Sequence, residues 1–265
     1  MTYFQALILG LVQGFTEFLP ISSSGHLVLM HRALGVTESG LTFDVALHFG
    51  TLLALVIFFW RELVVLAIAL VRKTGQTRLA WLIVAATIPA AVIGFLLESA
   101  AESSFRSPLL VSVNLAGFGF VMLAAEKYAG RIKHRTKLED TSKAQAITMG
   151  FAQAAAVVPG ISRSGSTITA GLFTGMDRVA ATRFSFLLGV PIIAGAVAKV
   201  MLKQTAFTEI KGELGIFMIG VLTAFVTGLI AIKFLLSYLS KHSLAVFAYY
   251  RIILAVLVLL IIGLN

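Results

Sequence analysis

Long apolar runs separated by short polar segments dominate the chain. A transmembrane α-helix needs about 20 mostly apolar residues. Six runs meet this requirement, at approximately 42–60, 79–97, 108–126, 182–202, 214–236 and 244–264. The run at 63–71 is too short to cross and is expected to lie along one membrane interface. The pattern therefore predicts an all-α polytopic membrane protein with about six full transmembrane helices.

Two further apolar regions, 1–34 and 144–175, are interrupted by polar motifs. The first contains EFLPISSSGH at 17–26 and the second contains VPGISRSGST at 158–167. Proline and glycine interrupt a helix in both motifs. Broken backbone at membrane depth is tolerated only inside protein or against a water-filled cavity. Each region is therefore expected to form a re-entrant hairpin of two half-length helices.

Composition agrees with a membrane protein. Of the 265 residues, 58% are hydrophobic and 12% are charged, and the mean hydropathy is +0.97. The net charge of +9 lies mostly in short loops, so it indicates membrane topology rather than nucleic-acid binding. The chain has no cysteine, which excludes disulfides and thiolate metal sites. Its N-terminus lacks a basic region and a signal-peptide cleavage site, so we expect mature sequence there.

Lysine and arginine predict the orientation. The loop 127–143 is the most basic and is expected in the cytoplasm with segments 61–78 and 237–243. The outer side is expected to hold both termini, segment 203–213, and segment 98–107 with Glu98, Glu102 and Arg106. Region 1–34 then enters the membrane from outside and region 144–175 from the cytoplasm.

The two interrupted regions also match in sequence. Six residues recur at a constant offset of 140: Gly10, Gln13, Ile21, Ser22, Ser24 and Gly25 reappear as Gly150, Gln153, Ile161, Ser162, Ser164 and Gly165. This predicts an inverted-topology repeat within a single membrane domain. Repeat one is approximately 1–126, the basic loop is 127–143 and repeat two is 144–265. Such a fold places its site where the two breaks meet, near the membrane midplane.

The second motif suggests an anion site. Arg163 is a cation inside the membrane with no acidic neighbour in sequence, and such a residue is functional by default. A helix beginning near Ser164 would direct free amide groups into the break. Together these groups suit phosphate, with the candidate residues Arg163, Ser162, Ser164, Gly165 and Thr167. Alternatively, Arg163 pairs with Glu17 and staples the two hairpins together.

The first motif brings groups that suit catalysis. Gln13 and Glu17 are spaced i, i+4 and share a helix face. A carboxylate, a histidine and a serine can activate a nucleophile and protonate a leaving group. The same residues could instead form a polar hinge that satisfies broken backbone. The catalytic candidates in this motif are Glu17, Ser23 and His26, and Ser22 and Ser24 are candidates for binding the phosphate.

Other polar residues within the apolar runs have simpler interpretations. Asp44 and His48 are also spaced i, i+4 and either line the cavity or lie at an interface. Arg251 is expected to pair within the bundle or to extend towards the interface. His26 and His48 lack a compact ligand pattern, so no dedicated transition-metal site is expected.

The stretches QGFTEFLPISSSGHL and PGISRSGST resemble the two signature motifs of the bacterial undecaprenyl-diphosphate phosphatases, the bacitracin-resistance family. The resemblance extends over essentially the whole chain, including FSFLLGVP, IPAAVIG, AFVTGLIAIK and AYYRI. It implies a bacterial plasma-membrane hydrolase that converts undecaprenyl diphosphate to undecaprenyl phosphate and inorganic phosphate. That reaction recycles the lipid carrier for cell-wall synthesis and confers bacitracin resistance. The resemblance also implies an active site that faces the outside and a dependence of the activity on Mg²⁺ or Ca²⁺.

The resemblance also implies residue roles. Glu17 matches the essential acidic residue, Ser23 the proposed nucleophile, His26 the motif histidine and Arg163 the phosphate-binding arginine. The first position of the family's E/Q-x-x-x-E pattern is Gln13, the neutral option, which weakens a two-carboxylate metal site at Gln13 and Glu17. Whether Ser23 attacks or positions a water stays open, as does the division of acid and base roles between Glu17 and His26.

A transporter or flippase of a polyprenyl phosphate or another anionic substrate is the second hypothesis, because inverted repeats with broken helices are typical of secondary transporters. The expected partners are a polyprenyl diphosphate lipid and the surrounding membrane lipid, and no nucleic acid. The sequence does not fix the oligomeric state, and a homodimer is compatible with it.

Overall fold

The computed structural model describes residues 1–36, 41–97 and 104–263, so Glu98 and Glu102 lie outside the described residues. The described chain is helical apart from loops and one isolated β-bridge between Thr136 and Met176. Its elements in chain order are α1 (Tyr3–Phe18), α2 (Ser23–Ala33), α3 (Leu41–Phe58), α4 (Trp60–Val71), α5 (Thr77–Leu96), the 3₁₀-helix η1 (Ser104–Arg106), α7 (Pro108–Ala129), α8 (Lys143–Ala155), α9 (Arg163–Phe173), α10 (Arg178–Met201), α11 (Gln204–Gly212), α12 (Leu214–Leu239) and α13 (Ala245–Gly263).

Five of the described helices are long and apolar enough to cross a membrane: α5, α7, α10, α12 and α13. A sixth candidate is α3, which passes the same test together with α4 across a bend of 81°. The bend takes α4 out of line with α3, which agrees with the short run 63–71 not continuing the span. The prediction of an all-α multi-pass membrane protein is confirmed.

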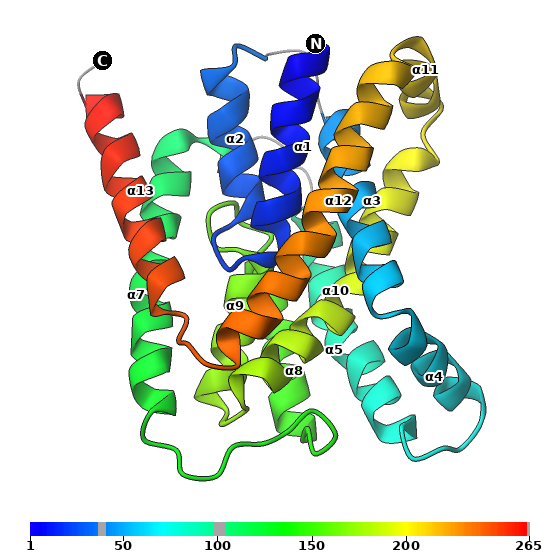
Figure 1. Cartoon of the computed structure of the whole chain (residues 1–265), viewed down its shortest axis with the longest axis vertical. Helices are drawn as coiled ribbons and strands as arrows, with labels where there is room; N and C mark the ends of the chain where they lie inside the picture. The colour runs from blue at the N-terminus through cyan, green and yellow to red at the C-terminus, as the bar shows by residue number, and fades with distance from the viewer. Residues whose placement is uncertain (37–40, 98–103, 264–265) are drawn as a thin grey trace.

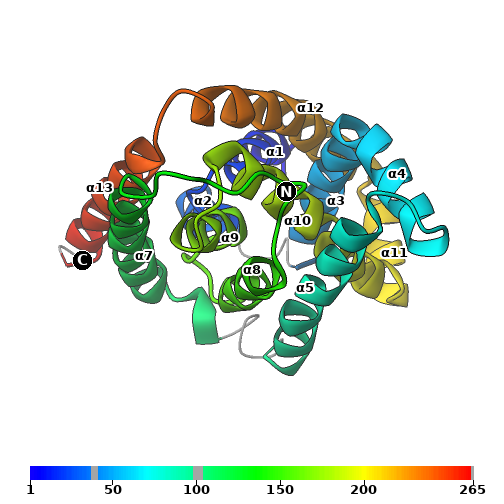
Figure 2. The ribbon, with the colours of Figure 1, turned by 90° about the horizontal axis from the view of Figure 1, so that it is seen from below.

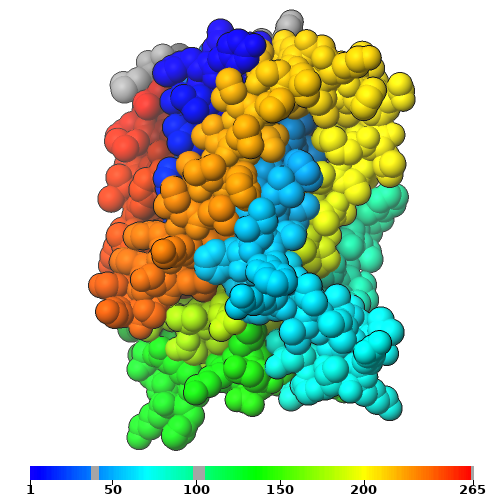
Figure 3. All heavy atoms as spheres, turned by 45° about the vertical axis from the view of Figure 1, so that its right-hand side comes forward, coloured from blue at the N-terminus to red at the C-terminus, as the bar shows by residue number. Residues whose placement is uncertain are grey.

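The outer surface of α12 is suited to lipid. Leu222, Val226 and Ile230 recur every four residues and each is more than half exposed, whereas Ala224 and Ala231 on the other side are buried. Figure 3 shows α12 crossing obliquely over α1 and α3 on this face. Small buried residues let membrane helices approach closely, and here they bring α12 against α1 and α3.

The two interrupted regions enter from opposite ends of the bundle. Both termini lie at one end, and the basic loop between α7 and α8 lies at the other (Figure 1). Helices α1 and α2 descend from the end with the termini, and α8 and α9 rise from the end with the loop. In Figure 2, α2, α8 and α9 lie inside a ring formed by α7, α13, α12, α3 and α5. The breaks of both hairpins are therefore enclosed by protein.

Local structure repeats at the same offset as the sequence. Thr2 and Ser142 begin α1 and α8 with the same capping box, in which the side chain of the third helical residue bonds back to the cap. Ser22 and Ser162 cap α2 and α9 in the same way as each other. The packing is exchanged between the halves, since α1 packs mainly on α12 and α8 mainly on α5. The inverted repeat predicted from the sequence is present in the fold.

Candidate active site where the two breaks meet

Ser22 and Ser162 hold the strained backbone of the two breaks. Their φ angles of 76° and 80° lie in the region that favours glycine, and no other non-glycine residue in the described part of the chain has a positive φ. Each serine Oγ accepts a hydrogen bond from a backbone amide in the first turn of the following helix, that of Gly25 or Gly165. The repeated serines thus fix where α2 and α9 begin.

The two breaks contact each other directly. Ser22 Oγ accepts a hydrogen bond from the Gly160 amide at 3.1 Å, and Ser164 Oγ donates to the Leu19 carbonyl at 3.1 Å. Each bond joins one repeat to the other. The breaks therefore form one polar centre inside the bundle, as the repeat predicted.

Arg251 of α13 supports this centre from one side. Its guanidinium is fully buried and donates to the carbonyls of both breaks, those of Pro20 at 3.2 Å, Gly160 at 2.6 Å and Ile161 at 3.0 Å. Two more bonds go to carbonyls of α7, at Leu115 and Asn114. The expectation that Arg251 pairs within the bundle is confirmed. Three of its five partners are backbone oxygens of the breaks, where no regular helix supplies a donor.

Glu17 connects the two motifs. Its side chain is 5% exposed, and its Oε1 accepts a hydrogen bond from Arg163 Nη2 at 2.7 Å. Its Oε2 accepts from Ser23 Oγ at 2.7 Å and from Gln13 Nε2 at 3.1 Å. His48 Nε2 lies 3.5 Å from the same oxygen. The carboxylate thus holds a serine hydroxyl on one oxygen and a guanidinium on the other.

Arg163 reaches Glu17 from the start of α9. Its Nη1 donates to the Ser185 carbonyl at 3.2 Å, so the guanidinium is held by α1 and α10 together. The Glu17–Arg163 pair is the staple that the sequence left as an alternative to an anion site. This ion pair does not exclude an anion site. A guanidinium has five N–H donors, and Arg163 keeps some of them for a ligand while it pairs with Glu17.

Most other hydroxyls of the second motif bind backbone. Thr167 Oγ1 donates to the Arg163 carbonyl and contacts Ser185 Oγ, and Ser164 Oγ is bound to Leu19 as described above. Ser162 is the hydroxyl of this motif that lines the cavity beside Arg163, and Ser23 and Ser24 line it from the first motif. The predicted phosphate-binding set is therefore divided between residues that face the cavity and residues that shape the break.

A cavity of about 280 Å³ opens beside these residues. Its apolar wall comes mainly from α5 (Ala90, Gly94) and from the second half of α10 (Ile192, Ile193, Ala196, Val197), with Val45, Ala156 and Val157 completing it. Its polar side chains are Glu17, Ser23, Ser24, His48, Gln153, Ser162 and Arg163. The lining parts of α5 and α10 lie towards the end of the bundle that carries the termini. This end lies opposite the basic loop 127–143.

His26 is directed away from Glu17. Its Nδ1 lies 2.8 Å from the Ser22 carbonyl and its Nε2 lies 2.8 Å from the Tyr250 hydroxyl, with the two rings stacked. His26 is not among the residues that line the cavity. The structure thus brings Glu17, Ser23 and Arg163 together and leaves His26 in contact with the cap of α2.

His48 lies where His26 was expected, beside Glu17. Its Nδ1 is 2.8 Å from the Asp44 carbonyl, which can only accept, so Nδ1 carries hydrogen and Nε2 faces Glu17 and the cavity. Asp44 itself binds His31 at 2.7 Å and Arg106 at 2.8 Å through its carboxylate. Of the two sequence alternatives for this pair, His48 lines the cavity and Asp44 fastens α3 to its neighbours.

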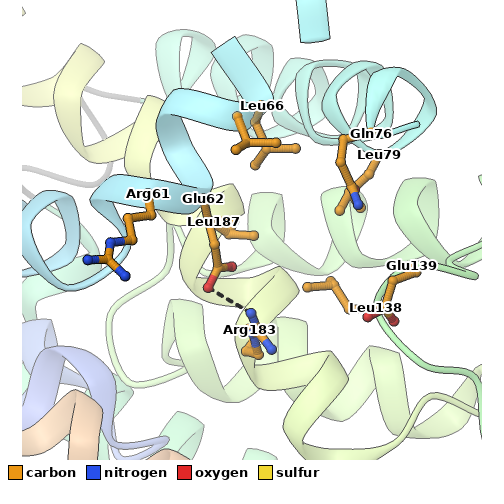
Figure 4. A pocket seen from close by; sticks show the side chains of 10 residues that line it. Arg61, Glu62, Leu66, Gln76, Leu79, Leu138, Glu139, Arg183 and Leu187 are labelled. Carbon is orange, nitrogen blue, oxygen red and sulfur yellow. Dashed lines mark hydrogen bonds and ion pairs between the residues drawn. The ribbon is translucent and has the colours of Figure 1, made fainter. Parts of the chain in front are cut away.

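A second cavity, of about 230 Å³, lies at the end with the basic loop, between α4, α5 and α10. In Figure 4, Glu62 and Arg183 point toward one another across it, and their ion pair measures 2.7 Å. None of its lining residues belongs to the two polar motifs. The cavity beside Glu17 is therefore the candidate active site.

The residues at this site offer few ligands for a divalent cation. The described residues contain no group of three His, Cys, Asp or Glu side chains that could hold a metal ion. Glu17 is the carboxylate at the cavity, and next to it the buried Gln13 Oε1 has no hydrogen-bond partner. Mg²⁺ is commonly bound by one or two protein oxygens together with substrate phosphates. These residues therefore fit a cation that substrate oxygens also hold, rather than a cage made by the protein.

Comparison with known proteins agrees with the motifs. A model of the family described as bacitracin resistance protein BacA matches residues 6–257. The chain belongs to the BacA family. It is 47% identical to a protein named undecaprenyl-diphosphatase from Moorella thermoacetica over 100% of both chains. Proteins of the same name from Rubrobacter xylanophilus and Desulforudis audaxviator are 48% and 44% identical, over 96% and 98% of both chains.

In this BacA-family chain, sequence reasoning missed three contributors to the site. Ser185 accepts a hydrogen bond from Arg163, and Tyr250 contacts His26, and both lie outside the two motifs in sequence. Gln153 was recognised only as a repeat position, although it lines the cavity. The i, i+4 spacing of Asp44 and His48 was a usable signal, but it did not show which way α3 faces.

Proposed function

We propose that the chain hydrolyses undecaprenyl diphosphate to undecaprenyl phosphate and inorganic phosphate, and so recycles the lipid carrier for cell-wall synthesis. The names of the three relatives support this reaction. The observation that carries the proposal is the Glu17 carboxylate, which holds the Ser23 hydroxyl and the Arg163 guanidinium on its two oxygens. In the proposed reaction these are a general base, a nucleophile and a phosphate ligand, and the general base contacts the other two.

In the first step, Ser23 Oγ attacks the terminal phosphorus while Glu17 Oε2 accepts the serine proton. The Oγ–P bond forms, the bond from phosphorus to the bridging oxygen breaks, and undecaprenyl phosphate leaves with the electron pair. The hydrogen bond of 2.7 Å between Ser23 and Glu17 supports this assignment. The alternative, in which Ser23 positions an attacking water, differs in forming no phosphoserine.

In the second step, water attacks the phosphoserine and gives a proton to His48 Nε2, the nitrogen that faces Glu17. The Oγ–P bond breaks, Glu17 returns a proton to Ser23, and inorganic phosphate leaves. His48 then gives its proton to the departing phosphate or to bulk water, which restores the starting state. His26 acts as a positioning residue, because its bond to the Ser22 carbonyl fixes the cap from which Ser23 projects.

Arg163 stabilises charge in both steps. On binding, the terminal phosphate takes guanidinium N–H groups that Glu17 and Ser185 share at rest. The cavity-facing Ser162, at the N-terminus of α9, lies beside it. Donors fixed in advance at a site with little water are worth more than the same donors in water.

We include Mg²⁺ or Ca²⁺ in the proposal as a cation that enters with the diphosphate. Glu17 and the unpartnered Oε1 of Gln13 would hold it together with phosphate oxygens. When bound, the cation would neutralise phosphate charge.

We also propose that the chain lies in the bacterial plasma membrane with its cavity open to the outer face. Two observations support this orientation. The cavity is lined by the ends of α5 and α10 nearest the termini, and the basic loop 127–143 lies at the opposite end of the bundle.

The test is phosphate release from undecaprenyl diphosphate by protein purified in detergent, with and without Mg²⁺ or Ca²⁺. We expect turnover by the parent protein and none by Arg163→Gln, with the exposed Arg72→Gln as the matched control. No release from folded parent protein across both cations and several prenyl chain lengths would overturn the proposal. Lipid scrambling in liposomes would then test the transporter hypothesis.

A further inference from the structure

Gln153 is a buried polar side chain whose amide is unused. It lies in the last turn of α8, is 3% exposed and lines the cavity beside Glu17. Neither its Nε2 nor its Oε1 has a hydrogen-bond partner among the described residues. Buried polar groups are paired in the great majority of cases, and an unpaired one is costly. An amide held in this state at a cavity wall is suited to a ligand.

The repeat explains why this amide is free. Gln153 corresponds to Gln13 at the offset of 140, and Gln13 Nε2 donates to Glu17 four residues later. In the second repeat, the residue four positions after Gln153 is Val157, which also lines the cavity. The partner that satisfies the first glutamine is therefore missing for the second. Gln13 supports the catalytic carboxylate, and Gln153 faces the cavity without one.

The substrate of the proposed reaction has two phosphates. In the proposed reaction Ser23 and Arg163 serve the terminal phosphate, and both are hydrogen-bonded to Glu17. Ser162 lines the cavity beside Arg163. Gln153 also lies outside the hydrogen-bond network of Glu17, and unlike the serines at the cavity its side chain has no hydrogen-bond partner among the described residues. The next cavity residues of its segment, Ala156 and Val157, are apolar. A neutral amide with two N–H donors can bind a phosphate oxygen without adding charge.

We propose that Gln153 binds the lipid-side phosphate, the one that stays on the prenyl chain as leaving group. This inference rests on the proposed function and names the residue that recognises the second phosphate. Gln153 then holds the diphosphate in line for attack at its terminal phosphorus and retains the monoester product. Positioning of this kind affects substrate binding and the transition state together.

The test separates the two products as competitive inhibitors. In Gln153→Met, a substitution of similar size without donors, we expect the inhibition constant for undecaprenyl phosphate to rise by about 10- to 100-fold. The constant for inorganic phosphate should stay unchanged, because that product occupies the Arg163 side. The melting temperature should not fall, since an unpaired buried amide has been removed. The exposed Gln204→Met is the matched control.

Equal constants in parent and variant would overturn the inference and show that water satisfies the amide. An equal rise for both products would also overturn it, because the effect would then not be specific to one phosphate. If Gln153→Met fails to fold, Gln153→Asn withdraws the amide by one methylene and gives the same comparison. Direct binding of undecaprenyl phosphate in detergent, measured for parent and variant, tests the role of Gln153 without depending on whether the protein hydrolyses the diphosphate. A parent protein that binds the monoester through Gln153 but does not hydrolyse the diphosphate would contradict the proposed function alone.

Discussion

Replacing Arg251 by methionine would remove the group that holds both breaks. Methionine fills similar space without donors, so five carbonyl oxygens would lose their hydrogen bonds to the guanidinium. Interhelical hydrogen bonds in membrane proteins average about 0.6 kcal/mol. Five of them give a loss of about 3 kcal/mol in the free energy of unfolding. Arg251→Lys keeps the charge but has three donors at one point, and we expect a smaller loss of about 1 kcal/mol.

The assay is unfolding by SDS in mixed micelles, followed by far-UV circular dichroism. The exposed Arg61, which stacks on Trp60, provides the control Arg61→Met with an expected change below about 0.5 kcal/mol. The order of stability should be parent, then Arg251→Lys, then Arg251→Met. Arg251→Met as stable as the parent would refute the reasoning, because the carbonyls of the breaks would then have found other donors.

Three further predictions concern the centre itself. Glu17→Gln should lower kcat by about 10²- to 10⁴-fold while the protein stays folded, as expected for loss of a general base; near-normal turnover would remove Glu17 from the mechanism. His48→Leu should lower kcat by about 10²-fold without changing the melting temperature, as expected for loss of a general base. His26→Leu should lower both kcat and the melting temperature, since His26 supports the break at Ser22; the opposite result for the two variants would contradict these roles. Gly160→Ala should cost about 1–3 kcal/mol in the same unfolding assay, because φ is +94° and a Cβ would come within 2.6 Å of the Val111 carbonyl oxygen; a variant of parental stability would show that this backbone can relax.

Hydropathy and charge predicted the spanning helices because lipid constrains each run locally. The ends of the helices were harder to predict from hydropathy. The span predicted to start at 182 begins at Arg178, where the Asp177 side chain caps the helix outside the apolar run. The short helix α11 lies in a segment treated only as an outer loop. These features depend on side-chain hydrogen bonds and not on hydropathy.

The candidate site was predictable where the repeat constrained it. The breaks, Glu17, Ser23 and Arg163 followed from two motifs that an inverted repeat must bring together. The orientation of the histidines did not follow, because it depends on contacts across the bundle. His26 reaches Tyr250, more than 200 residues later, and His48 faces Glu17 because of how α3 is rotated against α1. Such contacts leave no local pattern in the sequence.

The resting ion pair between Glu17 and Arg163 has a consequence for selectivity in a membrane crowded with phospholipid. A phosphodiester headgroup carries a single negative charge, and so does the carboxylate that Arg163 already holds. Such a headgroup gains little by displacing Glu17. The terminal phosphate of a diphosphate carries more charge and more acceptor oxygens, so it competes better for the guanidinium. In the proposed function, the ion pair therefore weakens the binding of bulk phospholipid headgroups at Arg163 more than the binding of the diphosphate.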